Sequence, residues 1–391
     1  MTERVLTPEA EALLYLTACA VNGAIPRKER VASFAWEKLL EKAKQQKMSA
    51  MAAIALESMH EEDQAVIPEE IRREWQKLRM SKLRRRMLFD AERGELFRLF
   101  DEKEIWYLPL KGIIIQDYYP VYEMREMTDN DILYNPQKKR KLCRIFKDRQ
   151  YRYVSEHNVD AFMKEPFFNF EMHRRIFPGN LSFFSAVMKR TIPAGDGTLE
   201  RLMTPEDFYL HFLQHARKHM LSKGSGIRPL ADLFVIQNSL GDKWDASLLE
   251  KGINALDLQN FRLVMEGLTD KLLSDPECQD ISKLSDEEWL FLSHMTGSYM
   301  YGDQQQFVRN FFEQNVGEQV TLRSRMKYLW LRLFPDMEYM KAYFPILRKI
   351  PVLLPFLYPV RWVLQWLRRS EHIKAELKFL RKISKVREDK S

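Results

Sequence analysis

Asp129 and Asp131 are the residues of this 391-residue chain whose type and spacing most directly suggest chemistry. They stand at the entry to an apolar run at 130–134, a pattern that predicts a β-strand. Side chains two residues apart in a strand point to the same side, so both carboxylates would face one way. Mg²⁺ is usually held by one or two carboxylates together with substrate phosphates. The pair therefore predicts a metal site for phosphoryl transfer; the alternative is that it only shapes a turn or cap.

A Lys-Gly turn precedes this pair in the chain. The apolar run IWYLPL at 105–110 predicts a buried strand that ends at Lys111 and Gly112, and a helix-like segment follows. Backbone N–H groups at such a turn, together with a lysine ammonium, are suited to bind a chain of phosphates. A glycine at 112 allows close approach of the backbone. The turn is therefore a candidate phosphate site.

A second polar pair, Glu171 and His173, lies on the strand predicted at 167–173. The two side chains would share one face of that strand. Glu171 would supply a third carboxylate, which could bind a second metal ion or act as a base toward an acceptor hydroxyl. Spacing alone equally allows this pair to be the polar face of an amphipathic strand.

Three histidines, His211, His215 and His219, recur every four residues on the helix predicted to begin at Thr204. They fall along one face of that helix. Such a row could bind zinc, but neither a cysteine partner nor an HExxH motif accompanies it. We expect His215 to line the site and the other two to have ordinary surface roles.

Predicted helices surround a short region of predicted strands. Helices are expected from Thr7 to Gly23, at 29–47 and at 68–103, and the Arg84–Arg86 triplet in the last is interpreted as a solvated face. Strands cluster only between about 105 and 175, with two further candidates at 151–155 and 167–173.

The predicted fold class is α+β, with a small mixed β-sheet core flanked by N-terminal and C-terminal helical regions. The expected regions are residues 1–104 (N-terminal helices), 105–190 (the α/β core), 191–340 (a helical domain) and 341–391 (a basic amphipathic tail).

The order of these motifs resembles a known family. The motifs are LPLKGIIIQDYYP, Arg125, TDNDILY, FEMH, TPEDFYLHFLQHARKH and IRPLADLF, and they extend over about residues 85–240. Together they resemble the poorly characterised bacterial nucleotidyltransferases of the polymerase-β-like superfamily. The resemblance implies an NTP as donor substrate and Mg²⁺ or Mn²⁺ as cofactor.

The resemblance also implies roles for individual residues. It assigns phosphate contact to Lys111 and Gly112, and metal binding and catalysis to Asp129, Asp131 and Glu171. It assigns supporting roles at the nucleotide site to Arg125, His173, His215, Arg228 and Asp232. In the wider superfamily a glycine-serine pair binds the triphosphate, and the Lys-Gly turn stands in its place here, which leaves the choice of nucleotide open. Arg228 and Asp232 are one helical turn apart and could instead pair only with each other.

Positive charge is concentrated at the C-terminal end. The chain carries a net charge of +7, and residues 341–391 contain 13 Lys or Arg and 4 Asp or Glu. A basic helix rich in Trp and Leu, predicted at about 360–386, could bind an anionic membrane surface or nucleic acid, or could pack on the protein itself.

The remaining composition favours a location in the cytoplasm, including the inner surface of the membrane. The 3 cysteines lie far apart, and we find neither a signal peptide nor an uncharged apolar run of about 20 residues.

The predicted reaction moves a nucleoside monophosphate from an NTP to a hydroxyl of an unidentified acceptor, which could be a protein, a tRNA, a sugar or a small molecule. The alternatives are a module that binds a nucleotide or a partner without turnover, and a nucleotidyltransferase of the toxin-antitoxin type.

Overall fold

The computed structural model of the protein describes residues 4–156, 159–176, 181–221 and 224–297, and beyond them 330, 333–335, 337, 340, 344–348 and 350–363. The chain divides into two compact units. The first consists of Met1–Arg217 with Gly226–Met300, and the second of Lys218–Ser225 with Tyr301–Ser391. Every residue predicted to form the site belongs to the first unit. The division into four regions stays a prediction.

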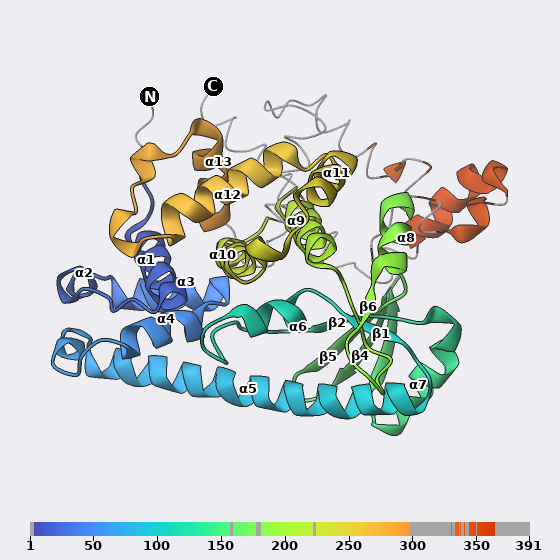
Figure 1. Ribbon diagram of the computed structural model, residues 1–391, viewed down its shortest axis with the longest axis horizontal. Helices are drawn as coiled ribbons and strands as arrows, with labels where there is room; N and C mark the ends of the chain where they lie inside the picture. Colours follow the sequence, from blue (N-terminus) through green and yellow to red (C-terminus); the bar gives the residue numbers. More distant parts are fainter. Residues whose placement is uncertain are drawn as a thin grey trace. The chain divides into compact units, whose positions relative to one another are not determined.

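Helices precede and follow the strands along the chain (Figure 1). Those before the first strand are α1 (Pro8–Asn22), α2 (Lys28–Ala32), α3 (Trp36–Gln46), α4 (Ser49–Glu57) and α5 (Glu69–Glu102). Those between strands are α6 (Gly112–Ile115), α7 (Lys139–Asp148) and α8 (Leu181–Arg190). Those after the last strand are α9 (Pro205–Leu221), α10 (Arg228–Leu240), α11 (Ala246–Leu256), α12 (Gln259–Leu273) and α13 (Asp286–Gly297).

The main sheet is mixed and has five strands in the order β1-β2-β5-β4-β3. The strands are β1 (Tyr107–Pro109), β2 (Asn130–Tyr134), β3 (Arg152–Glu156), β4 (Val159–Lys164) and β5 (Phe168–His173). The β2–β5 pair is parallel, and the other three pairs are antiparallel. Two short strands, β6 (Ile192–Pro193) and β7 (Arg201–Leu202), pair separately. The predicted α+β class is therefore confirmed.

One face of the sheet packs against α5 and α7. Leu96 and Phe100 of α5 are fully buried in this core, and Phe146 of α7 stacks on Phe162 of β4 with ring centroids 3.9 Å apart. Figure 1 shows α5 running as one long helix past both the N-terminal helices and the sheet. The helix starts directly after Pro68 with two glutamates in its first turn, where negative charge complements the helix dipole.

Two predicted elements differ from the structure. The single helix expected at 29–47 is broken into α2 and α3, because the intervening turn packs the Phe34 ring between Tyr15 and Trp36. Strand β4 has no counterpart among the predicted strands. Its sequence, VDAFMK, includes two charged residues that weaken the apolar pattern, although it pairs on both sides.

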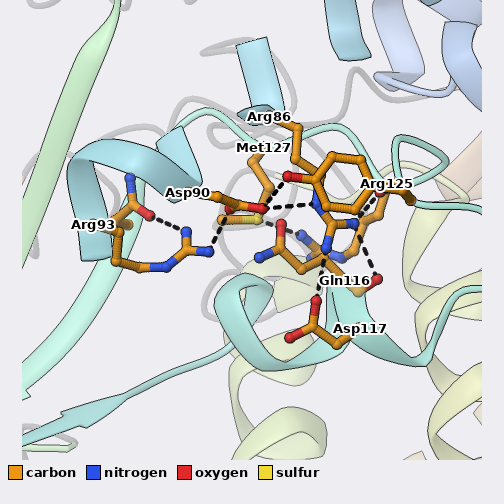
Figure 2. Close-up of polar contacts among 9 residues, drawn as sticks. Arg86, Asp90, Arg93, Gln116, Asp117, Arg125 and Met127 are labelled. Carbon is orange, nitrogen blue, oxygen red and sulfur yellow. Dashed lines mark hydrogen bonds and ion pairs between the residues drawn. The ribbon is translucent and has the colours of Figure 1, made fainter. Parts of the chain in front are cut away.

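The arginine triplet on α5 is not a uniform solvated face. Arg84 is exposed, but Arg86 is only 6% exposed. The Arg86 guanidinium donates hydrogen bonds to the backbone carbonyls of Gln116 and Tyr122 and to the Asp117 carboxylate (Figure 2). The interpretation of the triplet as solvated is therefore wrong for Arg86, because buried carbonyls in the 116–122 turn require a donor.

Most of the basic helix predicted at 360–386 lies outside the described residues. Within the described part, residues 354–363 are helical. Across the ranges that the structure describes, we find no helix with the length and apolar content needed to cross a membrane.

A buried carboxylate, Asp160, joins the far strands of the sheet. It accepts hydrogen bonds from Tyr134 (2.8 Å), Lys139 (2.9 Å), Tyr153 (2.7 Å) and two nitrogens of Arg174 (both 2.8 Å). Burial by itself would raise the pKa of Asp160, but hydrogen bonds from Arg174 and the other donors outweigh it and lower the pKa below its usual range.

We predict that Asp160→Asn lowers the free energy of unfolding at pH 7 by about 2–4 kcal/mol, because Lys139 and Arg174 lose the buried carboxylate that they both contact. The folded-state pKa of Asp160 lies below the unfolded value of about 3.9. Its stabilisation is therefore present above about pH 4 and is lost as the pH falls through the folded-state pKa. Urea denaturation measures this effect. The difference in free energy of unfolding between wild type and the variant should be smaller at pH 3 than at pH 7.

The exposed Asp148, at the end of α7, provides the matched control for this experiment. Asp148→Asn should change stability by less than about 0.5 kcal/mol. An equal loss in the two variants would contradict a special role for Asp160.

Candidate metal and phosphate site

Parallel pairing of β2 with β5 brings the predicted acidic residues together. In the strand register Asp131 lies opposite Glu171, and Leu133 lies opposite His173. Because side chains alternate along each strand, Ile132 and its neighbours on the other face enter the hydrophobic core. The polar residues are left on the face of the sheet that points away from α5 and α7.

Three potential metal ligands converge on this face. One ligand atom each from Asp131, Glu171 and His173 lies within 4.8 Å of the others. His173 Nε2 is 2.6 Å from Asp131 Oδ1, and Lys111 Nζ donates a hydrogen bond of 2.8 Å to the same oxygen. Two of the three predicted carboxylates thus meet, and His173 adds a third potential ligand.

Asp129 is near this group but is not a member of it. It immediately precedes β2, is half-buried, and its carboxylate is not one of the three grouped ligands. Burial raises the pKa of Asp129, the charge on Asp131 raises it further, and Lys111 and Arg228 partly oppose both effects. Its proposed role as a metal ligand stays a prediction.

The backbone at Lys111 has an unusual conformation. Its φ is 49° and its ψ is −118°, a backbone conformation that residues other than glycine rarely adopt. Gly112 follows, and a Cβ atom added there would lie 2.6 Å from both Arg125 Nη1 and Met127 Sδ. A side chain at 112 would therefore have to displace the Arg125 guanidinium, which Asp232 holds, and the Met127 thioether. The strained turn directs the Lys111 ammonium onto Asp131.

The ammonium of Lys111 sets the electrostatics of the cluster. Burial alone would raise the pKa of Asp131, but the charge of Lys111 and the hydrogen bond with His173 hold that pKa well below its usual range. Conversely, burial would lower the pKa of Lys111, and the charge and hydrogen bond of Asp131 raise it. Lys111 and Asp131 are therefore both ionised.

Glu171 experiences the opposite balance. Burial, followed by the negative charges of Asp131 and Asp129, raises the pKa of Glu171 to about 7. Lys111 offsets these effects only in part. The site is thus deficient in positive charge when all three carboxylates are ionised.

A second set of predicted residues forms a separate ion cluster. Arg125 donates two hydrogen bonds, of 2.7 and 3.0 Å, to the two oxygens of Asp232, and Tyr119 donates a third of 2.8 Å. Arg228 lies 3.9 Å from Asp232 and donates to the backbone carbonyl of Glu126. Arg228 and Asp232 therefore do not pair only with each other. Arg125 is the main partner, and it ties the segment before β2 to α10.

The histidine row of α9 contains one buried member. His211 is 1% exposed, so the expected surface role is wrong for this residue. Burial, with the nearby charge of Lys111, lowers the pKa of His211 to about 3 and keeps the ring neutral. His215 is half-buried, and its ring stacks on that of His211 at 6.4 Å. Among the described residues these histidines do not form a metal-binding group.

A supporting network behind the site was not predicted from the sequence. Arg93 of α5 donates a hydrogen bond of 2.9 Å to Asn130, the residue between the two aspartates. Figure 2 shows Arg93 and Arg86 joined through the carboxylate of Asp90. These three residues are spaced four and three apart on α5, which places them on one face of the helix. This spacing is the sequence pattern from which the network could have been predicted.

Comparison with known proteins identifies the family. A family model described as "Uncharacterised nucleotidyltransferase" matches residues 32–274, more than half of the chain. The protein belongs to this family, and the resemblance to poorly characterised nucleotidyltransferases noted from the motifs is confirmed. The match extends from the end of α2 to the end of α12. It therefore includes helices that precede the strands in the chain and helices that follow them. No curated protein and no solved structure matches the chain.

We predict that Glu171→Gln stabilises the protein in buffer containing EDTA. The folded-state pKa of about 7 lies above the unfolded value of about 4.3, so ionised Glu171 destabilises the folded state increasingly as the pH rises from 4 to 7. The free energy of unfolding of the variant should be about 1–3 kcal/mol higher than that of wild type at pH 8. At pH 4 the two free energies should be equal.

Denaturant titrations at the two pH values measure this difference. Glu165→Gln alters an exposed glutamate just before β5 and serves as the control. A Glu171→Gln variant that is less stable than wild type at pH 8 would contradict the electrostatic explanation.

Proposed function

We propose that this protein transfers a nucleoside monophosphate from an NTP to an acceptor hydroxyl, with the help of a divalent cation. The observation that carries the proposal is the grouping of Asp131, Glu171 and His173 within 4.8 Å, in a chain of a nucleotidyltransferase family. Lys111 lies beside this group, hydrogen-bonded to Asp131. Carboxylates next to an ammonium suit a substrate that arrives as a phosphate chain with its metal ion.

The donor atoms of the group fit Mg²⁺ or Mn²⁺. Both ions accept the carboxylate oxygens of Asp131 and Glu171, and the imidazole nitrogen of His173 is better suited to Mn²⁺. Asp129, two residues before Asp131, would supply a further carboxylate. When bound, the cation would neutralise charge on the phosphates and polarise the reacting phosphoryl group.

The proposed reaction is an in-line displacement at the α-phosphorus. The acceptor oxygen forms a bond to that phosphorus while the bond to the bridging oxygen of the β-phosphate breaks. Pyrophosphate leaves with that electron pair, and the hydroxyl proton passes to a base, a role open to Glu171 only where its carboxylate does not hold the cation. Lys111 would bind phosphate oxygens and offset their charge. The acceptor could be a protein side chain, a tRNA end, a sugar or a small molecule.

We predict that Asp131→Ala abolishes transfer of label from an NTP labelled at the α-phosphorus. Each of the four NTPs would be incubated with the protein, Mg²⁺ or Mn²⁺, and fractions of a cell extract as acceptors. Loss of the carboxylate should reduce label transfer and pyrophosphate release at least about a hundredfold, because it removes both metal binding and the partner of Lys111. Asp129→Ala should have a similar effect if Asp129 binds metal.

Asp196→Asn, which removes an exposed carboxylate between β6 and β7, is the control and should retain wild-type transfer. NTP binding measured by calorimetry without any transfer would contradict the proposal and support the non-catalytic binding module instead. Transfer that survives Asp131→Ala would place the reaction at another site.

A further inference from the structure

The described residues near the C-terminal end carry an apolar surface. Residues 354–363 are helical and directly follow a short 3-10 turn, Pro351–Leu353. Every exposed residue between 350 and 363 is apolar. These residues are three prolines together with Ile350, Val352, Phe356, Val360 and Val363. A contiguous apolar surface of this kind usually marks a place where a protein contacts a partner or a membrane.

Four of these side chains form a stripe along one side of the segment. Val352, Phe356 and Val360 are spaced four residues apart, and Val363 follows three residues later, which is the spacing of one helix face. Val352 is 77% exposed and Phe356 is 71% exposed. We call these four residues the apolar stripe.

The opposite side of the same helix is held by its own unit. The Tyr358 hydroxyl donates a hydrogen bond of 2.9 Å to the carbonyl of Pro335, and Trp362 Nε1 donates one of 2.9 Å to the carbonyl of Leu333. The Phe334 ring packs edge-on against both aromatic rings, with centroids 5.2 and 5.4 Å apart. Tyr358 and Trp362 each follow a stripe residue by two positions, about 200° around a helix. The apolar stripe therefore points away from this packing.

Positive charge accompanies the apolar stripe in the sequence. Residues 341–391 contain 13 Lys or Arg and 4 Asp or Glu. Anionic lipids attract basic segments that lie close to the membrane surface. A dimer formed through two apolar stripes would instead bring two basic segments together, and their repulsion opposes such a dimer. The charge therefore favours an anionic surface over a second copy of the chain.

The exposed side chains favour lipid over nucleic acid. Nucleic-acid binding relies on cations that contact phosphates and on aromatic rings that stack on bases. Among the exposed side chains of residues 350–363 there is one aromatic ring, that of Phe356, and no cation. An interfacial helix instead buries an apolar face at the boundary between headgroups and acyl chains, while basic residues interact with the headgroups.

We propose that residues 350–363 bind the surface of a membrane that contains anionic lipid, with Val352 and Phe356 inserted at the boundary between headgroups and acyl chains. The basic residues of the same part of the chain supply the attraction to the anionic headgroups. This inference is independent of the proposed nucleotidyl transfer.

The test is cosedimentation of the full chain with vesicles of phosphatidylcholine that contain about one third phosphatidylglycerol. We expect binding that Phe356→Ser weakens about tenfold and Val352→Ser/Phe356→Ser about a hundredfold, because burial of each large apolar side chain contributes roughly one order of magnitude. Binding to vesicles of phosphatidylcholine alone should be weaker.

Leu290→Ser is the control, because Leu290 is a comparably exposed apolar residue, on α13 of the first unit. This variant should bind the anionic vesicles as wild type does. The replaced side chains are all exposed, so thermal unfolding curves of the variants should match that of wild type.

Several results would overturn the proposal. These are absence of vesicle binding, equal binding by Phe356→Ser and wild type, and an equal loss in Leu290→Ser. Equal binding to neutral and anionic vesicles would overturn the role of anionic lipid. Without vesicle binding, an oligonucleotide that Phe356→Ser releases would assign the apolar stripe to nucleic acid. A dimer that dissociates in the same variant would assign it to a second copy. None of these measurements requires turnover, which Asp131→Ala tests separately.

Discussion

The site depends on the burial of like charges on neighbouring strands. Parallel pairing of β2 with β5 places Asp131 opposite Glu171, and Asp129 precedes the same strand by one residue. Repulsion between carboxylates is strong where water is largely excluded, and Lys111 supplies a compensating cation at hydrogen-bond distance. That ammonium contacts Asp131 directly, which explains why the pKa of Asp131 is lowered while the pKa values of Glu171 and Asp129 are raised.

The position of Lys111 depends in turn on a second buried ion pair. Its backbone has a positive φ, and the next residue, Gly112, is packed against Arg125. Arg125 is held by both oxygens of Asp232 from α10. The acidic cluster is thus connected to α10 through a series of contacts, although Asp232 itself belongs to a different ion cluster. Sequence comparison alone would group all of these residues as parts of one nucleotide site.

Local pattern predicted much of this architecture. Alternation along the strands correctly placed Asp131 on β2 and both Glu171 and His173 on one face of β5, because that periodicity is a property of each strand by itself. The adjacency of β2 and β5 could not be predicted in this way, since pairing between distant strands depends on the packing of the whole sheet. The burial of Arg86 and His211 was missed for the same reason: their type suggested solvent, and only tertiary contacts enclose them.

Helix α5 has a mechanical consequence for this arrangement. It is continuous over 34 residues, which is about 50 Å at 1.5 Å per residue. It holds the 116–122 turn through Arg86, supports Asn130 through Arg93 and enters the sheet core through Phe100. An unbroken helix moves as a rigid body more readily than it bends. The three contacts of α5 therefore keep their positions relative to one another. The 116–122 turn, Asn130 and the sheet core are therefore mechanically coupled through α5.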